Sequence, residues 1–133
     1  MTFVRSMAEC ALPACLRTMR SDGAPLIELD EIEATIVSNR AIARVHRTFF
    51  NDPTPTDVIT FPNGEILIGA GVVAGNAARF GNTPNDEAAL CLIHALLHLA
   101  GWDDQTDHDA KDMRRKQEQI FKMAHRVVCS RDQ

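Results

Sequence analysis

Apolar and polar residues alternate along this chain with two different periods, which predicts a mixture of helices and short strands. Residues 5–20 are rich in Ala, Leu, Met and Arg and predict a helix that ends at Ser21-Asp22-Gly23. Residues 31–37 (EIEATIV) alternate polar with apolar side chains, which is the period of a strand with one buried face.

A second helix is predicted from Ser38 or Asn39, either of which can cap it, to about Phe50. We expect its core face to carry three apolar side chains, Ile42, Val45 and Phe49. The two prolines that follow cannot continue a helix, so residues 51–55 are predicted to form a loop.

The middle of the chain predicts a β-hairpin. Residues 57–62 and 65–68 are short apolar stretches rich in β-branched side chains, and Asn63-Gly64 between them is a tight-turn signal. A third helix is predicted from about Val72 to Phe80.

The next helix is the most apolar of the chain and is expected to be the buried centre of the domain. Thr83 is a suitable N-cap for it, and Pro84 suits its first position. Five apolar side chains should cover the face opposite its histidines: Ala89, Leu92, Ile93, Leu96 and Leu99. Thr106 can cap a last, highly charged helix from about Asp107 to Val127.

Length and composition indicate one globular domain over residues 1–133. The chain has 45% hydrophobic and 24% charged residues, both ordinary for such a domain. No apolar run approaches the roughly 20 residues that span a bilayer, and the N-terminus lacks the apolar core of a signal peptide, so we expect a cytoplasmic protein without membrane contact. The net charge of −4 argues against non-specific coating of nucleic acid, but it leaves room for a local basic groove.

The segment from His94 to Asp104 carries the strongest chemical signal. His94 and His98 are four residues apart in a helical stretch, so both imidazoles leave the same face and can bind one ion. Gly101 then allows the chain to turn back toward a carboxylate, Asp104. Three ligands leave one tetrahedral position of Zn²⁺ open, which is typical of catalytic sites. The glutamate that zinc proteases carry beside the first histidine is Ala95 here, so peptidase chemistry is disfavoured.

Neighbouring residues offer alternative interpretations. Asp104 has the best spacing for the third ligand, and His108 is its rival because imidazole is a common zinc donor. Cys91 lies one turn before His94 and is predicted to be a small buried side chain, with a ligand role as the minor alternative. Trp102 is predicted to pack under the loop, with base stacking as its alternative.

Arg40, Arg44 and Arg47 share one face of the second helix and precede the proline-rich loop, so this arginine face could line a phosphate-binding groove, with a solvated helix face as its alternative. The basic residues of the last helix alternate with acids and are predicted to be solvated. His46 and His125 are isolated and are predicted to lie at the surface.

Three separated segments resemble one family, the YbeY endoribonucleases that mature ribosomal RNA in bacteria. Residues 94–104 (HALLHLAGWDD) are similar to the family pattern HGxLHLxGYDH. Residues 55–62 (PTDVITFP) are similar to PTDVLSFP, and residues 64–69 (GEILIG) are similar to GDIVI. The resemblance covers roughly residues 31–122.

Position by position, the resemblance implies that His94 and His98 are the first two zinc ligands and that Asp104 replaces the third histidine. Asp104 is still a legitimate zinc ligand. An arginine that the family carries before its PTD motif is replaced by Phe50. Three residues near the motifs are candidates for a general base: Thr56, Asp57 and Asp103.

The resemblance therefore implies an α+β fold in which a small mixed β-sheet packs with helices around a central metal-binding helix. It also implies a zinc-dependent endoribonuclease that cleaves single-stranded RNA in ribosomal RNA maturation and ribosome quality control, with ribosomal RNA and the small subunit as partners and no DNA. Two alternatives stay open: a ribosome-assembly protein whose metal is structural, and a zinc hydrolase of a small substrate.

Overall fold

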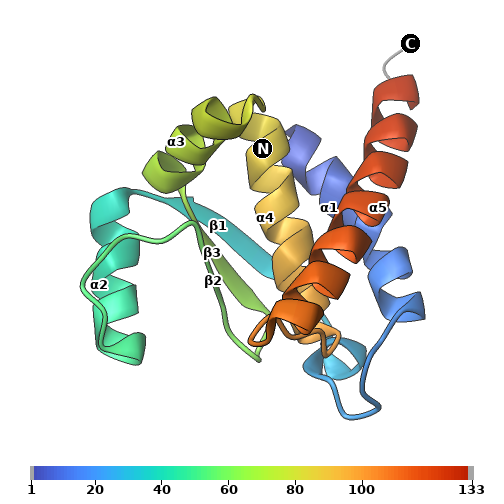
Figure 1. Ribbon diagram of the computed structural model, residues 1–133, viewed down its shortest axis with the longest axis horizontal. Coiled ribbons are helices and arrows are strands. Elements are labelled where there is room, and N and C mark those ends of the chain that lie inside the picture. The colour runs from blue at the N-terminus through green and yellow to red at the C-terminus, as the bar shows by residue number, and fades with distance from the viewer. Residues whose placement is uncertain (1, 132–133) are drawn as a thin grey trace.

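The computed structural model describes residues 2–131 and has an α+β fold, as expected (Figure 1). Its first half contains α1 (Thr2–Arg17), the 3₁₀ turn η1 (Pro25–Glu28), β1 (Glu33–Val37), α2 (Asn39–Phe50) and β2 (Val58–Thr60). Its second half contains β3 (Glu65–Gly69), α3 (Ala70–Phe80), α4 (Pro84–Leu99) and α5 (Asp107–Arg131). Each helix and strand predicted from the sequence is present, with ends displaced by a few residues. Within residues 2–131, no helix is both long enough and apolar enough to cross a membrane.

The three strands form a small mixed sheet in the order β1-β3-β2. β2 and β3 are antiparallel and form the predicted hairpin, whose turn places Gly64 at a φ of +95°. β1 pairs with β3 in parallel, from Glu33 opposite Glu65 to Val37 opposite Gly69. The connection between these parallel strands therefore contains both α2 and β2.

The two faces of the sheet are covered by different helices. Ile66 and Ile68 of β3 belong to the main core beneath α4, whereas Leu67 points to the other face, where Ile42 of α2 covers it. This alternation follows from the two-residue period of a strand. In Figure 1, α2 accordingly lies on one side of the sheet, and α4, α1 and α5 lie on the other.

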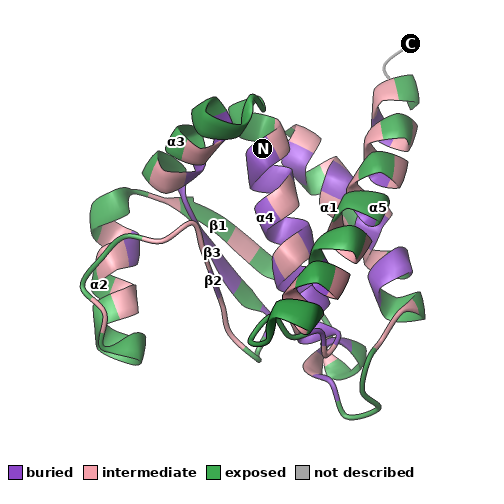
Figure 2. Cartoon of the chain, viewed as in Figure 1, coloured by how far each residue is buried: buried purple, intermediate pink, exposed green. Residues whose placement is uncertain are grey.

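α4 is the centre of the molecule, as predicted. The Thr83 side chain accepts a hydrogen bond from the Asp86 amide (3.1 Å), and Pro84 occupies the first helical turn. The five apolar residues expected in the core are all buried, and so are Ala88, Cys91, Ala95 and Leu97 on the other sides. Figure 2 shows this burial along the length of the helix. Because each buried leucine or isoleucine contributes about 1.5–3 kcal/mol, α4 is a rigid platform for its two histidines.

The end of α2 differs from the sequence prediction. Ser38 caps the helix through its side chain (3.1 Å to the Ala41 amide), and Ile42 is buried, as expected. Phe49 was expected to lie on the core face, but this prediction is wrong, because 64% of its surface is exposed. The Phe49 ring packs edge-to-face against Phe61, which follows β2, and most of its surface faces solvent.

Candidate metal centre

His94, His98 and Asp104 converge at the end of α4. The two imidazole Nε2 atoms are 3.1 Å apart, and Asp104 Oδ2 lies 3.5 Å from His94 Nε2 and 3.6 Å from His98 Nε2. The histidines come from consecutive helical turns, whereas Asp104 returns to them through the loop after α4. Gly101 makes that return possible with a φ of +97°, a conformation that favours glycine.

Both imidazoles are held in place through their second nitrogen. His98 Nδ1 lies 3.1 Å from the Trp102 carbonyl, and because a carbonyl only accepts, Nδ1 must carry the proton. His94 Nδ1 donates in the same way to Gln117 Oε1 on α5 (2.8 Å). Both Nε2 atoms are therefore left with lone pairs. This arrangement, in which a ligand imidazole donates its other N–H to a carbonyl oxygen, is usual around metal ions in proteins.

The donor set fits a small divalent cation. Two ligands of a tetrahedral Zn²⁺ at the usual bond lengths lie about 3.3–3.6 Å apart, which is close to the spacing of these three atoms. Without a cation or a shared proton, the two Nε2 lone pairs would repel each other. The Asp104 carboxylate adds the negative charge that favours a cation at this point.

Electrostatics at His94 favour the neutral imidazole. Burial is the largest effect and lowers the pKa of His94 below its ordinary value, and the charge of His98 acts in the same direction. The Gln117 hydrogen bond and the nearby carboxylates of Asp104 and Asp57 act against this shift but do not cancel it. A neutral imidazole is the form that binds metal.

The alternative ligands lie elsewhere. His108 has 84% of its side chain exposed and pairs with Asp112 on α5 (3.3 Å). Cys91 is buried, as predicted, and its thiol lies 3.8 Å from Asp57 Oδ2. Burial raises the pKa of Cys91, which keeps the thiol protonated.

Trp102 packs inside the molecule, as predicted. It is buried, and its indole N–H donates to the Thr18 carbonyl of the segment after α1 (2.9 Å). The Arg20 guanidinium lies over the ring at 4.0 Å from its centre. The ring is thus unavailable to stack a base, and it anchors the loop that carries Asp104.

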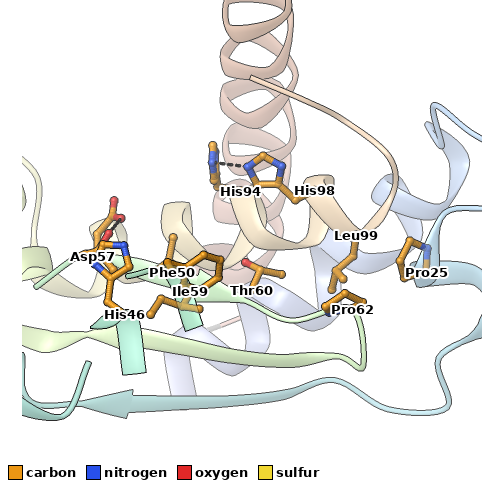
Figure 3. A pocket seen from close by; sticks show the side chains of 12 residues that line it. Pro25, His46, Phe50, Asp57, Ile59, Thr60, Pro62, His94, His98 and Leu99 are labelled. Atoms are coloured by element: carbon orange, nitrogen blue, oxygen red, sulfur yellow. Dashed lines mark hydrogen bonds between the residues drawn. The ribbon is translucent and has the colours of Figure 1, made fainter. Parts of the chain in front are cut away.

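A groove of about 470 Å³ opens beside the two histidines (Figure 3). Its lining residues come from η1, α2, β2 and its flanks, and α4: Pro25, His46, Phe50, Thr56, Asp57, Val58, Ile59, Thr60, Pro62, His94, His98 and Leu99. In Figure 3, His46, Phe50 and Asp57 lie toward one end of the groove, and Pro25 and Pro62 lie toward the other. The two imidazoles thus stand over an elongated surface.

Two of the three candidate general bases line the groove. Thr56 and Asp57 line it, whereas Asp103 is exposed and accepts a hydrogen bond from the Gln105 amide (2.9 Å). Gly69 supports the first two, because its amide donates to the Asp57 carbonyl (2.7 Å) and a side chain at Gly69 would collide with the Thr56 carbonyl. Asp57 is therefore held at the groove by β3.

His46 is a groove residue that the sequence analysis missed. It was predicted to lie at the surface, but only 20% of its side chain is exposed, and its Nδ1 donates to the Thr54 carbonyl (2.8 Å). The sequence signal for this position is its spacing, because His46 lies one helical turn before Phe50 on the same face of α2.

The Arg40, Arg44 and Arg47 side chains are exposed and lie about a quarter turn around α2 from Phe50, outside the groove lining.

Comparison with known proteins identifies close relatives. The family model described as Endoribonuclease YbeY matches residues 4–125. The Endoribonuclease YbeY of Sulfurovum sp. (strain NBC37-1) is 36% identical over 105 residues, which cover 68% of this chain and 70% of that protein. The Endoribonuclease YbeY of Chlorobium phaeovibrioides is 28% identical over 137 residues, covering 97% and 90%. The solution structure of TM1509 from Thermotoga maritima matches with a TM-score of 0.66 and 28% identity, covering 98% of this chain and 86% of that one.

The lowered pKa of His94 generates a prediction for the metal-free protein. We expect His94 to titrate below the ordinary histidine value of 6.5 in the folded state and near it in urea. Because the unfolded chain then binds the proton more readily, this group reduces stability as the pH falls below about 6.5. Imidazole NMR signals across a pH series measure the titration. A folded-state value at or above that of the urea-unfolded chain would contradict the prediction.

Proposed function

The chain belongs to the YbeY endoribonuclease family, and we propose that it is a metal-dependent endoribonuclease that cleaves single-stranded RNA in ribosomal RNA maturation and ribosome quality control. The observation that carries this proposal is the convergence of two imidazoles and a carboxylate beside an elongated groove. Ribosomal RNA and the small subunit are the proposed partners, and the cytoplasm is the proposed location.

We propose that His94, His98 and Asp104 hold one Zn²⁺ per chain. Three protein ligands leave a coordination position open, and a Zn²⁺ bound in this way supplies a Lewis acid and lowers the pKa of bound water toward neutrality. The two imidazoles are already oriented for binding, because their Nδ1–H groups donate to Gln117 and to the Trp102 carbonyl. Ala95 points into the core beside them and offers no proton acceptor.

Asp57 is the proposed general base. It is the carboxylate that lines the groove, and its charge acts on His94 across the site. The Thr56 hydroxyl (3.4 Å from Oδ1) and the Cys91 thiol (3.8 Å from Oδ2) orient the carboxylate. A carboxylate held in this way can accept a proton from an attacking water, which typically contributes about 10²–10⁴-fold to a rate.

The arginine face of α2, formed by Arg40, Arg44 and Arg47, is proposed to bind RNA phosphates. With a net charge of −4, the chain needs a local basic surface to attract RNA. These three exposed side chains lie on the same helix as Phe50, which stands where the family pattern has an arginine. In this proposal they hold the strand, while Asp57 and the three metal ligands act on it.

A ribosome-assembly protein with a structural metal is a second candidate. Phe50 favours it, because a phenyl ring cannot stabilise negative charge on a phosphate as an arginine would. Binding of ribosomal RNA without cleavage would support this candidate. A zinc hydrolase of a small substrate is less favoured, because the groove is elongated rather than a closed pocket.

The metal proposal predicts a difference between two single variants. Asp104→Ala should lower metal affinity by at least about tenfold, because one of three ligands is lost. His108→Ala is the matched control and should retain the metal, since its imidazole pairs with Asp112. Elemental analysis of both proteins and of a His94→Ala/His98→Ala double variant decides the matter. Equal metal in all three would show that the ion is not held here.

The endoribonuclease proposal predicts metal-dependent cleavage of unpaired RNA. The native protein should cut a labelled single strand, lose this activity with a chelator and regain it when Zn²⁺ is restored. A duplex of the same sequence should be cut far more slowly. Gel analysis of the products measures both rates. Cleavage that persists unchanged in chelator would contradict a metal-dependent mechanism.

The general-base proposal predicts that Asp57→Asn reduces the cleavage rate by about 10²–10⁴-fold, because an amide cannot accept the proton. The metal content and the affinity for RNA should stay close to those of the native protein. Asp103→Asn is the control and should cleave normally. The idea fails if Asp57→Asn cleaves as fast as the control.

A further inference from the structure

Phe49, Phe50 and Phe61 form a group of rings, here called the aromatic cluster, in which Phe49 and Phe50 are exposed and Phe61 is partly buried. Phe49 is 64% exposed and Phe50 53% exposed, and both belong to the last turn of α2. The Phe61 ring centre lies 5.2 Å from that of Phe49 and 6.4 Å from that of Phe50. Isolated exposed apolar residues need no explanation, whereas a contiguous group of them marks a binding surface.

The aromatic cluster is continuous with the groove of the metal centre. Phe50 lines the groove together with His46, and the two ring centres are 5.8 Å apart. His94 and His98 stand over the same groove (Figure 3). A chain lying in the groove would therefore pass from the imidazoles onto the Phe50 ring, with the arginine face about a quarter turn around the same helix.

We propose that the aromatic cluster stacks the unpaired bases of the RNA whose phosphates the arginine face binds. This inference rests on the proposed function, because it takes RNA to be the substrate. Stacking on an aromatic side chain contributes about 5- to 150-fold in affinity per base and tolerates any sequence. Bases inside a duplex already stack on each other and do not expose a face, so the cluster selects single strands.

The size of the cluster argues against the alternative occupants. A stable interface between proteins buries about 1,200–2,000 Å² in total, whereas each phenylalanine can bury at most about 150–250 Å². The rings match the size of one or two bases better than they match a second copy of this chain. The neighbouring arginines also complement a polyanion.

The test separates the aromatic faces of the rings from their hydrophobicity. The Phe49→Leu/Phe50→Leu variant removes the aromatic faces, and Phe49→Tyr/Phe50→Tyr keeps them. Phe80→Leu is the control, because Phe80 is similarly exposed (62%) at the far end of α3. Each of these proteins also carries Asp57→Asn to slow cleavage, is loaded with its metal, and is titrated with a short single-stranded RNA containing 2-aminopurine and with a matched abasic RNA. Gel analysis confirms that the strands stay intact, and circular dichroism confirms the fold.

The native, Tyr and Phe80→Leu proteins should bind tightly and quench the 2-aminopurine fluorescence. The double Leu variant should bind about 5- to 150-fold more weakly for each base that no longer stacks, and it should not quench the fluorescence. Its log–log salt dependence should not change, since no phosphate contact is lost. On abasic RNA, the native and double Leu proteins should bind equally.

Equal affinity of the native and double Leu proteins for the 2-aminopurine strand overturns the stacking proposal. An equal loss on abasic RNA also overturns it, because the rings would then act without a base. A native dimer that the double Leu variant cannot form, seen by sedimentation, would assign the cluster to a second copy instead. Quenching by these proteins, with no cleavage by the metal-loaded protein that retains Asp57, retains the stacking and overturns the endoribonuclease proposal. The absence of RNA binding by the native protein overturns both.

Discussion

The hydrogen bond from His98 Nδ1 to the Trp102 carbonyl is the contact on which the geometry of the site depends (3.1 Å). It fixes which imidazole nitrogen of His98 faces His94 and Asp104, and it also holds the loop that brings Asp104 back. The same loop is tied to the N-terminal segment, because the Trp102 indole donates to Thr18 and the Arg20 amide donates to the Ala100 carbonyl (both 2.9 Å). One backbone oxygen thus connects α4, the loop and the candidate ligands, and the position of that loop depends on its hydrogen bonds to the segment after α1.

Local signals predicted most of the fold because they depend on neighbouring residues alone. The Ser38 and Thr83 caps, the hairpin turn and the four-residue spacing of His94 and His98 all belong to this class. Phe49 and His46 were misjudged because their burial depends on tertiary contacts: Phe49 meets the edge of the Phe61 ring, whereas the loop after α2 folds back onto His46 through the Thr54 carbonyl. A helical pattern gives the direction of a side chain but not the presence of a partner.

The candidate site also combines features that follow from local sequence with features that depend on tertiary contacts. The histidine pair follows from helix geometry, and the spacing to Asp104 follows from the family pattern. The contributions of Gln117, His46 and Gly69 come from elements far from α4 in the sequence. Hydrogen bonds and close backbone approaches between distant segments leave no periodic trace, so they become visible only in the folded molecule.

The parallel pairing of β1 with β3 has a consequence for the order of folding. The pairing of Glu33 with Glu65 closes the long segment that contains α2 and β2, so it is a non-local contact with an entropic cost. The imidazole pair needs only one local helix. A chain emerging during synthesis therefore has its groove strands before α4, and acquires both nitrogen donors as soon as that helix forms. The carboxylate of Asp104 and the amide of Gln117 follow α4 in the chain, so the site is complete only when the segment after that helix has folded back.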